Sequence, residues 1–451
     1  MAPILAPAVA ATGRRRDLHP KPIFDEPSLR SFLTGHGAKP VHMGRIWKHV
    51  TSQLRLGCPP SDVSLVDVPG LPNGLGVALA ANFTVLTSQV VQRHVSELDG
   101  TMKLLIRLQD GSEVEAVVIH HSGEAEHPEQ RQADRCGERD TLCVSSQVGC
   151  RLGCRFCATG TMGLLGNLWA GEIQEQLIHA RTQKGHSDSV CNVVFMGMGE
   201  PLENYEAVAS AIRGLVDPMR FGLAPSSVTV STVGSSPHHM QRLLEELPKI
   251  RLAVSLHAPN QSLREELVPA AKAIPIDKLL AIVDDHAKKG EAKRLRTVMV
   301  SYVLLKGVND SLDHARELSA LLSDRPVIVN LIPYNPFEGN IYGYEEPSPA
   351  TVDEFLQVLA ESNIRVFERR HHGRDIAAAC GQLAKLGTSA TGLETDIENG
   401  GCTLNKDLVR KKSPKWSGSS PRGEMWRSVL LLGAMGGLVA LGAFSLRRWR
   451  R

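Results

Sequence analysis

From about residue 142 to residue 367, short apolar segments alternate with single amphipathic segments, and this alternation limits the fold more than any other feature of the sequence. The pattern predicts strands at 142–146, 192–196, 227–232, 251–256, 296–304, 327–332 and 364–367, and helices at 170–183, 205–216, 237–247, 277–288, 312–322 and 350–360. Because one helix connects each strand to the next, neighbouring strands pair in parallel through right-handed crossovers. The sequence therefore predicts an α/β fold, with an open doubly wound sheet as one form of it, and functional side chains at the carboxyl ends of the strands.

Three cysteines lie within eight residues, in the C-x3-C-x2-C arrangement of Cys150, Cys154 and Cys157. Gly149 and Gly153 give the backbone the permissive φ angles that it needs to bring three thiolates together. A structural zinc site takes four protein ligands, and no second cysteine or histidine pair follows at zinc-finger spacing, so zinc fits this stretch poorly. A four-iron cluster held by three cysteines leaves one iron open for a substrate. The residues therefore favour a catalytic iron–sulfur cluster.

The cysteine spacing, with Phe156 before the last cysteine, resembles the signature of the radical S-adenosylmethionine (SAM) superfamily. The resemblance implies that the α/β fold is a partial (β/α)6 barrel. The residue pattern adds a small N-terminal helical domain and a short β element. The resemblance also implies a [4Fe–4S] cluster on the three cysteines, with SAM bound at the open iron.

The ends of the expected strands carry glycines and short polar side chains of the kind that bind a small ligand. Singly, each would be an ordinary turn or capping residue, but together they resemble the SAM-contacting positions of one subfamily, the RlmN/Cfr family of RNA adenosine methyltransferases. The positions that the resemblance assigns to SAM are Gly199, Glu200, Ser231, Ser255, Leu256, His257 and Asn335. Glu200 matches the segment that binds the methionine ammonium group, and a carboxylate suits that role. The resemblance covers residues 26–386.

Two further cysteines and a glutamate match the same family. Cys380 matches the cysteine that carries the methyl group, Cys143 matches its disulfide partner, and Glu115 matches the proton acceptor. Without the resemblance, Cys380 would be read as a buried small apolar residue and Glu115 as a surface residue of a strand. The basic residues of 369–374 favour a thiolate and a phosphate group near Cys380.

The resemblance implies a methyltransferase that acts on C2 of an adenosine in ribosomal or transfer RNA and uses two SAM molecules per turnover. Adenine C2 lies between two electron-withdrawing nitrogens and is no nucleophile, so a radical route is required, and the resemblance implies that this route passes through a methylated cysteine. Methylation at C8, as in the Cfr branch, is the close alternative. The resemblance further implies RNA as partner, flavodoxin or ferredoxin as electron donor, and a monomer. The alternative from another class is a membrane-tethered protein that binds RNA without modifying it and holds an iron–sulfur or zinc site.

Composition and pattern divide the chain into six segments. The expected segments are a disordered or transit segment at 1–25, a helical accessory domain at 26–88, a small β element with a loop insertion at 89–140, the catalytic barrel at 141–387, a flexible linker at 388–426 and a transmembrane anchor at 427–451.

The last segments differ from the rest of the chain in charge. Residues 388–451 hold 11 of the 51 Lys and Arg but 5 of the 48 Asp and Glu, so the rest is slightly acidic and must bind RNA through local patches. The uncharged run 429–446 is flanked by arginines and, at about 1.5 Å per residue, reaches roughly 27 Å, which is typical of a membrane anchor. Nine cysteines without an N-terminal apolar signal indicate a reducing compartment. We therefore expect a cytoplasmic-type catalytic domain with a tail anchor, or organellar targeting through the N-terminal segment.

Overall fold

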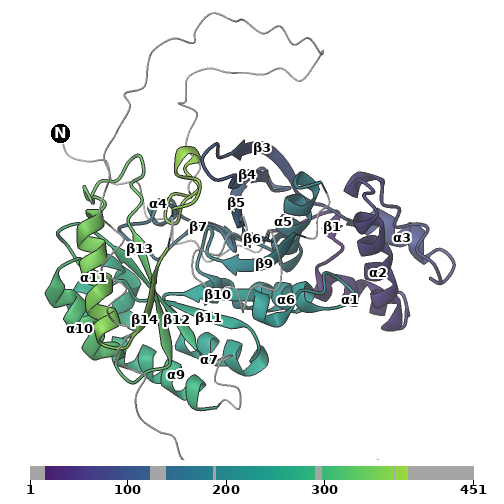
Figure 1. Ribbon diagram of the computed structural model, residues 1–451. Helices are drawn as coiled ribbons and strands as arrows, with labels where there is room; N and C mark the ends of the chain where they lie inside the picture. The colour runs from purple at the N-terminus through teal and green to yellow at the C-terminus, as the bar shows by residue number, and fades with distance from the viewer. Residues whose placement is uncertain (1–15, 122–138, 186–188, 290–296, 370, 384–451) are drawn as a thin grey trace, which may run out of the picture. The chain divides into compact units, whose positions relative to one another are not determined.

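Ten strands form one sheet in the computed structural model, which describes residues 16–121, 139–185, 189–289, 297–369 and 371–383 (Figure 1). The strands are β3 (Gln89–Val95), β4 (Met102–Arg107), β5 (Glu113–His121), β6 (Arg139–Cys143), β9 (Val190–Phe195), β10 (Val228–Thr232), β11 (Arg251–Ser255), β12 (Val298–Leu304), β13 (Val327–Pro333) and β14 (Arg365–Glu368). Their spatial order is β14-β13-β12-β11-β10-β9-β6-β5-β4-β3. Strands β6 and β9 to β14 pair in parallel, so the predicted α/β fold is confirmed. Among the described strands, β14 and β3 are the two edges, and the sheet is a partial barrel.

Helices cross between the parallel strands and lie around the outer side of the sheet (Figure 1). They are α5 (Ala170–Gln183), α6 (Tyr205–Val216), α7 (Pro237–Glu246), α8 (Gln261–Leu267), α9 (Ile276–Lys288), α10 (Leu312–Leu322) and α11 (Pro349–Glu361). Serine hydroxyls begin three of them: Ser236, Ser311 and Ser348 accept hydrogen bonds from the backbone N–H three residues later. The six predicted helices are confirmed, whereas the short α8 was not predicted.

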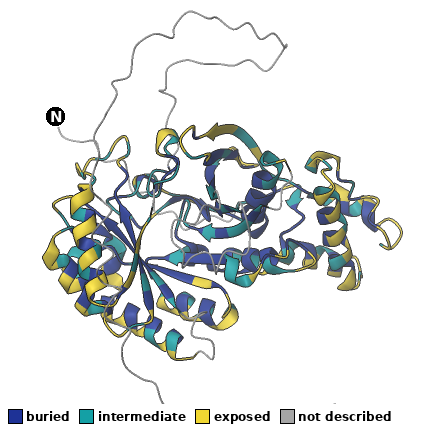
Figure 2. Cartoon of the chain, in the orientation of Figure 1, coloured by how far each residue is buried: buried dark blue, intermediate teal, exposed yellow. Residues whose placement is uncertain are grey.

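Apart from the edge strand β14, the parallel strands are largely buried on both faces, as Figure 2 shows in dark blue, while the exposed residues lie mainly on the outward faces of the helices. In β11, for example, Leu252, Ala253 and Val254 are all at most 3% exposed. Burial on both faces explains why these strands read as continuous apolar runs and not as alternating patterns.

The small β element is part of the same sheet as the barrel. Strand β5 pairs antiparallel with β6, with Val117 opposite Cys143, while β4 pairs with both β3 and β5. The segment predicted to form a small β element contains β3, β4 and β5, and these strands extend the barrel sheet and cover the edge of β6 that would otherwise offer unpaired backbone groups. This continuity places Glu115 and Cys143 on adjacent strands.

The N-terminal helices pack beside this sheet together with a short parallel strand pair. The elements are β1 (Lys21–Pro22), α1 (Glu26–Gly35), α2 (Val41–Arg55), α3 (Leu75–Asn82) and β2 (Phe83–Thr84). Residues 16–25 fall in the segment that the sequence assigns to disorder or transit, yet Leu18, Ile23 and Phe24 are at most 1% exposed. Burial of these three apolar side chains fixes that part of the segment.

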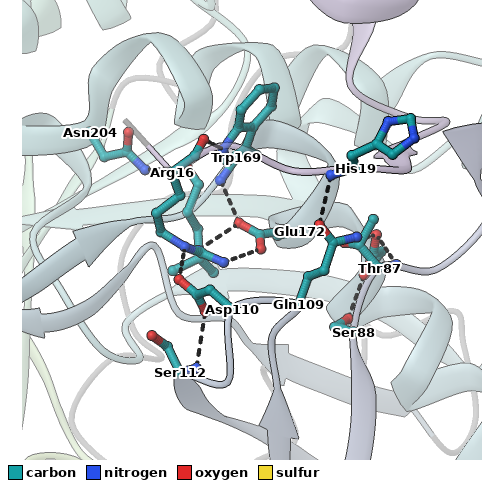
Figure 3. Close-up of polar contacts among 12 residues, drawn as sticks. Arg16, His19, Thr87, Ser88, Gln109, Asp110, Ser112, Trp169, Glu172 and Asn204 are labelled. Atoms are coloured by element: carbon teal, nitrogen blue, oxygen red, sulfur yellow. Dashed lines mark hydrogen bonds and ion pairs between the residues drawn. The ribbon is translucent and has the colours of Figure 1, made fainter. Parts of the chain in front are cut away.

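A buried polar network joins the N-terminal segment to the sheet and to α5 (Figure 3). The Arg16 guanidinium donates to both carboxylate oxygens of Glu172, at 3.0 and 2.7 Å, and also pairs with Asp110. Glu172 accepts in addition from the Trp169 backbone N–H at 2.9 Å, which begins α5. The bidentate pair fixes the entry of the chain on the barrel, because the Glu172 side chain is fully buried.

One turn further along α5, Glu175 makes the free energy of unfolding depend on pH. Burial raises the pKa of this carboxyl to about 7, against hydrogen bonds from Thr87 and Ser88 that lower it. The folded state therefore binds more protons than the unfolded state between the ordinary pKa near 4.5 and 7, so stability falls as pH rises through that window and the loss is complete above pH 7. We expect Glu175 to lower the free energy of unfolding by roughly 3 kcal/mol between pH 5 and pH 8, and Glu175→Gln to remove that slope.

Urea unfolding at a series of pH values measures the effect. Glu354→Gln, on the exposed face of α11, is the matched control and should keep the wild-type pH dependence. An unchanged slope in Glu175→Gln would show that Glu175 does not carry the buried proton.

Several expected segments lie outside the described residues: 1–15, the insertion at 122–138, the linker at 388–426 and the anchor at 427–451. Within the part of the chain that the structure describes, no helix has the length and apolar character to cross a membrane.

Candidate active site

A cavity of about 160 Å³ lies at the carboxyl ends of the parallel strands, where the sequence places the functional residues. The predicted residues that line it are Cys150, Cys154, Cys157, Gly199, Glu200, Ser231, Ser255, His257, Asn335 and Cys380. Leu256 is the exception, because its side chain is fully buried in the apolar core. Its backbone N–H donates to the Ser301 carbonyl at 3.0 Å, so only the side chains on either side of it reach the cavity.

The three clustered cysteines are held in a loop that begins in a hairpin. Cys150 ends β7 (Gln147–Cys150), which pairs antiparallel with β8 (Gly163–Asn167), and Cys157 precedes the short helix α4 (Ala158–Thr161). Gly149 has a φ of 74°, and a Cβ there would lie 1.9 Å from the Gly163 carbonyl oxygen. Glycine is therefore required for the hairpin to close under the loop.

The three clustered cysteines are half-buried. Burial raises the pKa of Cys150 to about 12 and also raises those of Cys154 and Cys157. Deprotonation of the three therefore accompanies metal binding, which releases protons.

Glu200 follows β9 and faces the cavity with its carboxylate fixed. Oε1 accepts from the Thr232 hydroxyl at 2.6 Å and Oε2 accepts from the Val233 backbone N–H at 3.1 Å. Burial raises the pKa of this carboxyl to about 7. A cationic group of a ligand placed in the cavity would stabilise the charged form. Gly199, with a φ of 101°, brings the backbone against Gln147, whose side chain accepts from the Glu200 N–H at 2.8 Å.

His257 is a neutral histidine with a fixed tautomer. Its Nδ1 accepts from the Val303 backbone N–H at 3.0 Å, and burial lowers its pKa to about 3. The proton is therefore on Nε2, which remains as a donor for a ligand. The ring lies edge-on to Phe156, with centroids 4.6 Å apart, so the histidine also packs against the cysteine loop.

The remaining predicted polar residues come from three different strands. Ser231 and Ser255 lie on adjacent strands with their hydroxyls 3.3 Å apart. Asn335 follows β13, is 3% exposed, and its Oδ1 has no hydrogen-bond partner among the described residues. A buried unpaired acceptor that lines a cavity indicates a ligand with an N–H or O–H group.

Cys380 lies between the cysteine loop and Cys143. It lines the main cavity and also a smaller one of about 20 Å³, whose walls include Cys143. The described C-terminal segment 371–383 lies beside α4 (Figure 1), and the Ala158 N–H donates to the Gly381 carbonyl at 2.7 Å. Burial, with the Cys380 thiol as the next cause, raises the pKa of Cys143 to about 12. Both thiols are free in the structure, so the expected disulfide is not formed.

Glu115 lies on β5 next to Cys143 and is tied to the Cys380 segment through one lysine. Its carboxylate forms an ion pair with Lys103 at 3.3 Å, and the Lys103 ammonium also donates to the Ala377 carbonyl at 3.2 Å. Glu115 is 4% exposed, so it is not the surface residue of a strand that the sequence would indicate without the family resemblance.

Three residues of the site were not singled out by the sequence. Lys103 anchors Glu115, Ser301 lines the main cavity, and Arg264 lies fully buried behind it. Ser301 stands in the middle of an expected strand and not at its end, and Lys103 looks like an ordinary polar residue of the β element. Arg264 falls between the expected strand 251–256 and the expected helix 277–288, where a charged residue is ordinary, so the sequence carries no signal for it either.

Comparison with known proteins agrees with this geometry. Residues 144–318 match the family described as the radical SAM superfamily. A protein of Desulforudis audaxviator named probable dual-specificity RNA methyltransferase RlmN is 40% identical over 323 residues, which cover 72% of this chain and 94% of that protein. The ribosomal RNA large subunit methyltransferase N of Nitrosopumilus maritimus is 40% identical over 328 residues, 72% of this chain and 88% of its own. A crystal structure of a radical SAM methyltransferase from Sphaerobacter thermophilus superposes with a TM-score of 0.68 at 35% identity, covering 80% of this chain and 99% of that one.

The cofactors of the chain are a [4Fe–4S] cluster and SAM, and the residues present fit both. Three thiols line one cavity, and the Glu200 carboxylate and the unpaired Asn335 oxygen face the same space. In the described residues, no three His, Cys, Asp or Glu side chains converge on a single metal ion. A four-iron cluster does not require such convergence, because each thiolate binds a different iron.

Loss of one clustered thiol should therefore empty the site. We expect Cys154→Ala to lose most of the iron of the wild type after anaerobic reconstitution, and chelation of the wild type to have the same result, with SAM cleavage falling below detection in both. Iron and sulfide analysis and the visible absorption spectrum measure the loss. Cys58→Ala, at a free cysteine of the N-terminal helical region, is the control and should keep its iron. Full iron content in Cys154→Ala would contradict the assignment.

The relatives are covered over nearly their whole length at 40% identity, and the cysteine loop, the strand-end residues and Cys380 meet around one cavity. The chain therefore belongs to the RlmN family of radical SAM RNA methyltransferases.

Proposed function

We propose that this protein methylates C2 of an adenosine in ribosomal or transfer RNA, with Cys380 as the residue that carries the methyl group. One observation carries the proposal: Cys380 lines the cavity of the three clustered cysteines and also the smaller cavity of Cys143. A sulfur in that place can receive a methyl group on one side and meet a resolving thiol on the other.

The residues divide the chemistry among them. With the cluster and SAM bound, the site would supply a carbon-centred radical able to take a hydrogen atom from the methyl group on Cys380. Glu200, Ser231, Ser255, His257 and Asn335 hold SAM in the cavity. After the carbon has joined the base, Glu115 accepts the ring proton. The Cys143 thiolate then attacks the Cys380 sulfur and forms a disulfide, while the electron pair of the broken bond stays on the transferred carbon, which takes a proton and becomes the methyl group. The surplus electron of the radical adduct would pass back to the cluster.

The RNA class rests on the names of the relatives, one called dual-specificity RNA methyltransferase and one called ribosomal RNA large subunit methyltransferase. Mass spectrometry of nucleosides from ribosomal and transfer RNA treated with the reconstituted enzyme tests it. We expect 2-methyladenosine. Finding 8-methyladenosine alone would assign the protein to the alternative reaction, and finding neither, with no SAM cleavage, would favour a binding protein.

We further propose the surroundings in which this reaction runs. The family resemblance implies a monomer that receives electrons from flavodoxin or ferredoxin. The sequence pattern supports the segment boundaries given above and a membrane anchor formed by the uncharged run 429–446. A fluorescent fusion of the full chain, compared with one that ends at residue 387, tests the anchor. Identical distribution of the two fusions would exclude it.

A further inference from the structure

A single arginine is fully buried behind the active-site cavity. Arg264, on α8, has an exposure of 0% and is the largest of the fully buried side chains. Removing a guanidinium from water is costly unless the charge is compensated. The burial of Arg264 therefore indicates that a negative group lies near its guanidinium.

The hydrogen bonds of Arg264 go to uncharged acceptors. Its Nη2 donates to the Val233 carbonyl at 2.7 Å, and Nη1 lies 3.3 Å from the Ile274 carbonyl. Its Nε is buried without a partner, and no carboxylate in the described residues forms an ion pair with the guanidinium. The two nearest acids on the same helix are engaged elsewhere, Glu265 with Gln261 and Glu266 with Arg155.

The helix that carries Arg264 packs on the cysteine loop. The Leu267 carbonyl, near the end of α8, accepts from the Arg155 N–H at 3.0 Å, and Leu263 and Leu267 belong to the same apolar cluster as the three cysteines. Val233, whose carbonyl Arg264 contacts, lines the main cavity. Burial lowers the pKa of Arg264 to about 10, and the Cys154 thiol opposes that shift, so the guanidinium stays charged at neutral pH.

We propose that Arg264 is the buried counter-cation of the iron–sulfur cluster. Its positive charge is uncompensated and lies behind the Cys154 side of the loop, where it stabilises the reduced state of the cluster. A four-iron cluster with three thiolates carries a net negative charge that grows by one on reduction. In the water-poor space behind the loop, a nearby cation favours the more negative state and raises the reduction potential. Arg264 is not among the residues that line the main cavity, so it would act on the cluster through its charge.

This inference depends on the [4Fe–4S] cluster that the family uses, and it does not depend on which atom of the RNA base is methylated. Its test uses the full chain, reconstituted anaerobically without SAM or RNA, and follows the cluster by electron paramagnetic resonance during a redox titration. Three variants separate charge from hydrogen bonding. Arg264→Gln keeps hydrogen-bonding capacity without charge, Arg264→Met keeps apolar volume only, and Arg264→Lys keeps the charge with a different donor geometry.

We expect the midpoint potential to shift to more negative values in both neutral variants and to stay closer to the wild type in Arg264→Lys. Arg155→Gln is the matched control: it also removes an arginine beside the clustered cysteines, but Arg155 is partly exposed and pairs with Glu266, so water screens it and the shift should be small.

Two results would overturn the inference. One is a wild-type midpoint potential in Arg264→Gln and Arg264→Met. The other is an equal shift in all three Arg264 variants, which would assign the effect to the hydrogen bonds with the backbone. If the neutral variants fail to hold a cluster, Arg264→Lys tests the inference. A Lys variant that retains its iron and has a midpoint potential near that of the wild type supports the role of Arg264 as counter-cation, and a Lys variant that loses its iron excludes it. If the protein does not methylate RNA, the expected shifts in midpoint potential remain the same, because the titration is done without SAM or RNA.

Discussion

Replacing Cys380 by alanine is expected to abolish methyl transfer to RNA while the iron content stays at the wild-type level. The Cys380 sulfur is the only atom of the proposed site that bonds to the transferred carbon, so no other side chain can substitute for it. Activity should fall by roughly 10³-fold or more, as is usual when a covalent nucleophile is removed. Transfer of labelled methyl groups from SAM to RNA, together with iron analysis, measures both quantities.

The control for this variant is Cys58→Ala, which removes a half-buried thiol far from the cavity and should keep full activity. Peptide mass spectrometry adds a second readout: the wild type should carry a methyl group on the peptide that contains Cys380, and the variant should carry none. Methylated RNA from Cys380→Ala at the wild-type rate would refute the proposed role.

Replacing Cys143 by alanine is expected to have a different result, because the reaction should then stop after the carbon has joined the base. Cys143 is buried and lines the same small cavity as Cys380, so its sulfur is the one placed to attack the Cys380 sulfur. Without that attack, the bond between Cys380 and the transferred carbon persists and RNA remains attached to the protein. Turnover should fall below detection while a covalent protein–RNA species accumulates in proportion to the enzyme.

A denaturing gel with labelled RNA detects this species, and nuclease digestion followed by mass spectrometry locates it on Cys380. Cys143→Ser should behave like Cys143→Ala, because a hydroxyl cannot form the disulfide. The double variant Cys143→Ala/Cys380→Ala should form no adduct. Normal turnover without any adduct in Cys143→Ala would exclude the resolving role.

The sequence predicts the barrel well because each strand and helix is visible in a short stretch of residues, and the same alternation is repeated along the chain. Apart from the last one, which forms the edge strand β14, the apolar runs are largely buried on both faces of the sheet, so strands and the helices between them stand out without any knowledge of distant contacts. The clustered cysteines are equally clear, since their spacing alone brings them to one loop. Neither property depends on the path of the rest of the chain.

The parts that the sequence does not predict depend on contacts between distant segments. Lys103 gains its role only because β4 pairs with β5 and Ala377 lies above it, 274 positions later. Leu256 shares a segment with Ser255 and His257, yet its side chain enters the core, because a motif does not say which neighbour faces the cavity. The ordered residues 16–25 depend on Glu172 and Asp110 as partners for Arg16.

The pairing of β5 with β6 has a consequence for the timing of the reaction. Glu115 and Cys143 are fixed on adjacent strands of one hydrogen-bonded sheet, whereas Cys380 belongs to a segment that lies in no strand and is attached by scattered contacts to α4 and Lys103. Local opening is cheapest where backbone hydrogen bonds are few. The proton acceptor and the resolving thiol therefore keep their positions in the sheet. If local opening on the millisecond-to-second scale limits turnover, amide hydrogen exchange should detect that opening in residues 371–383 and not in the strands.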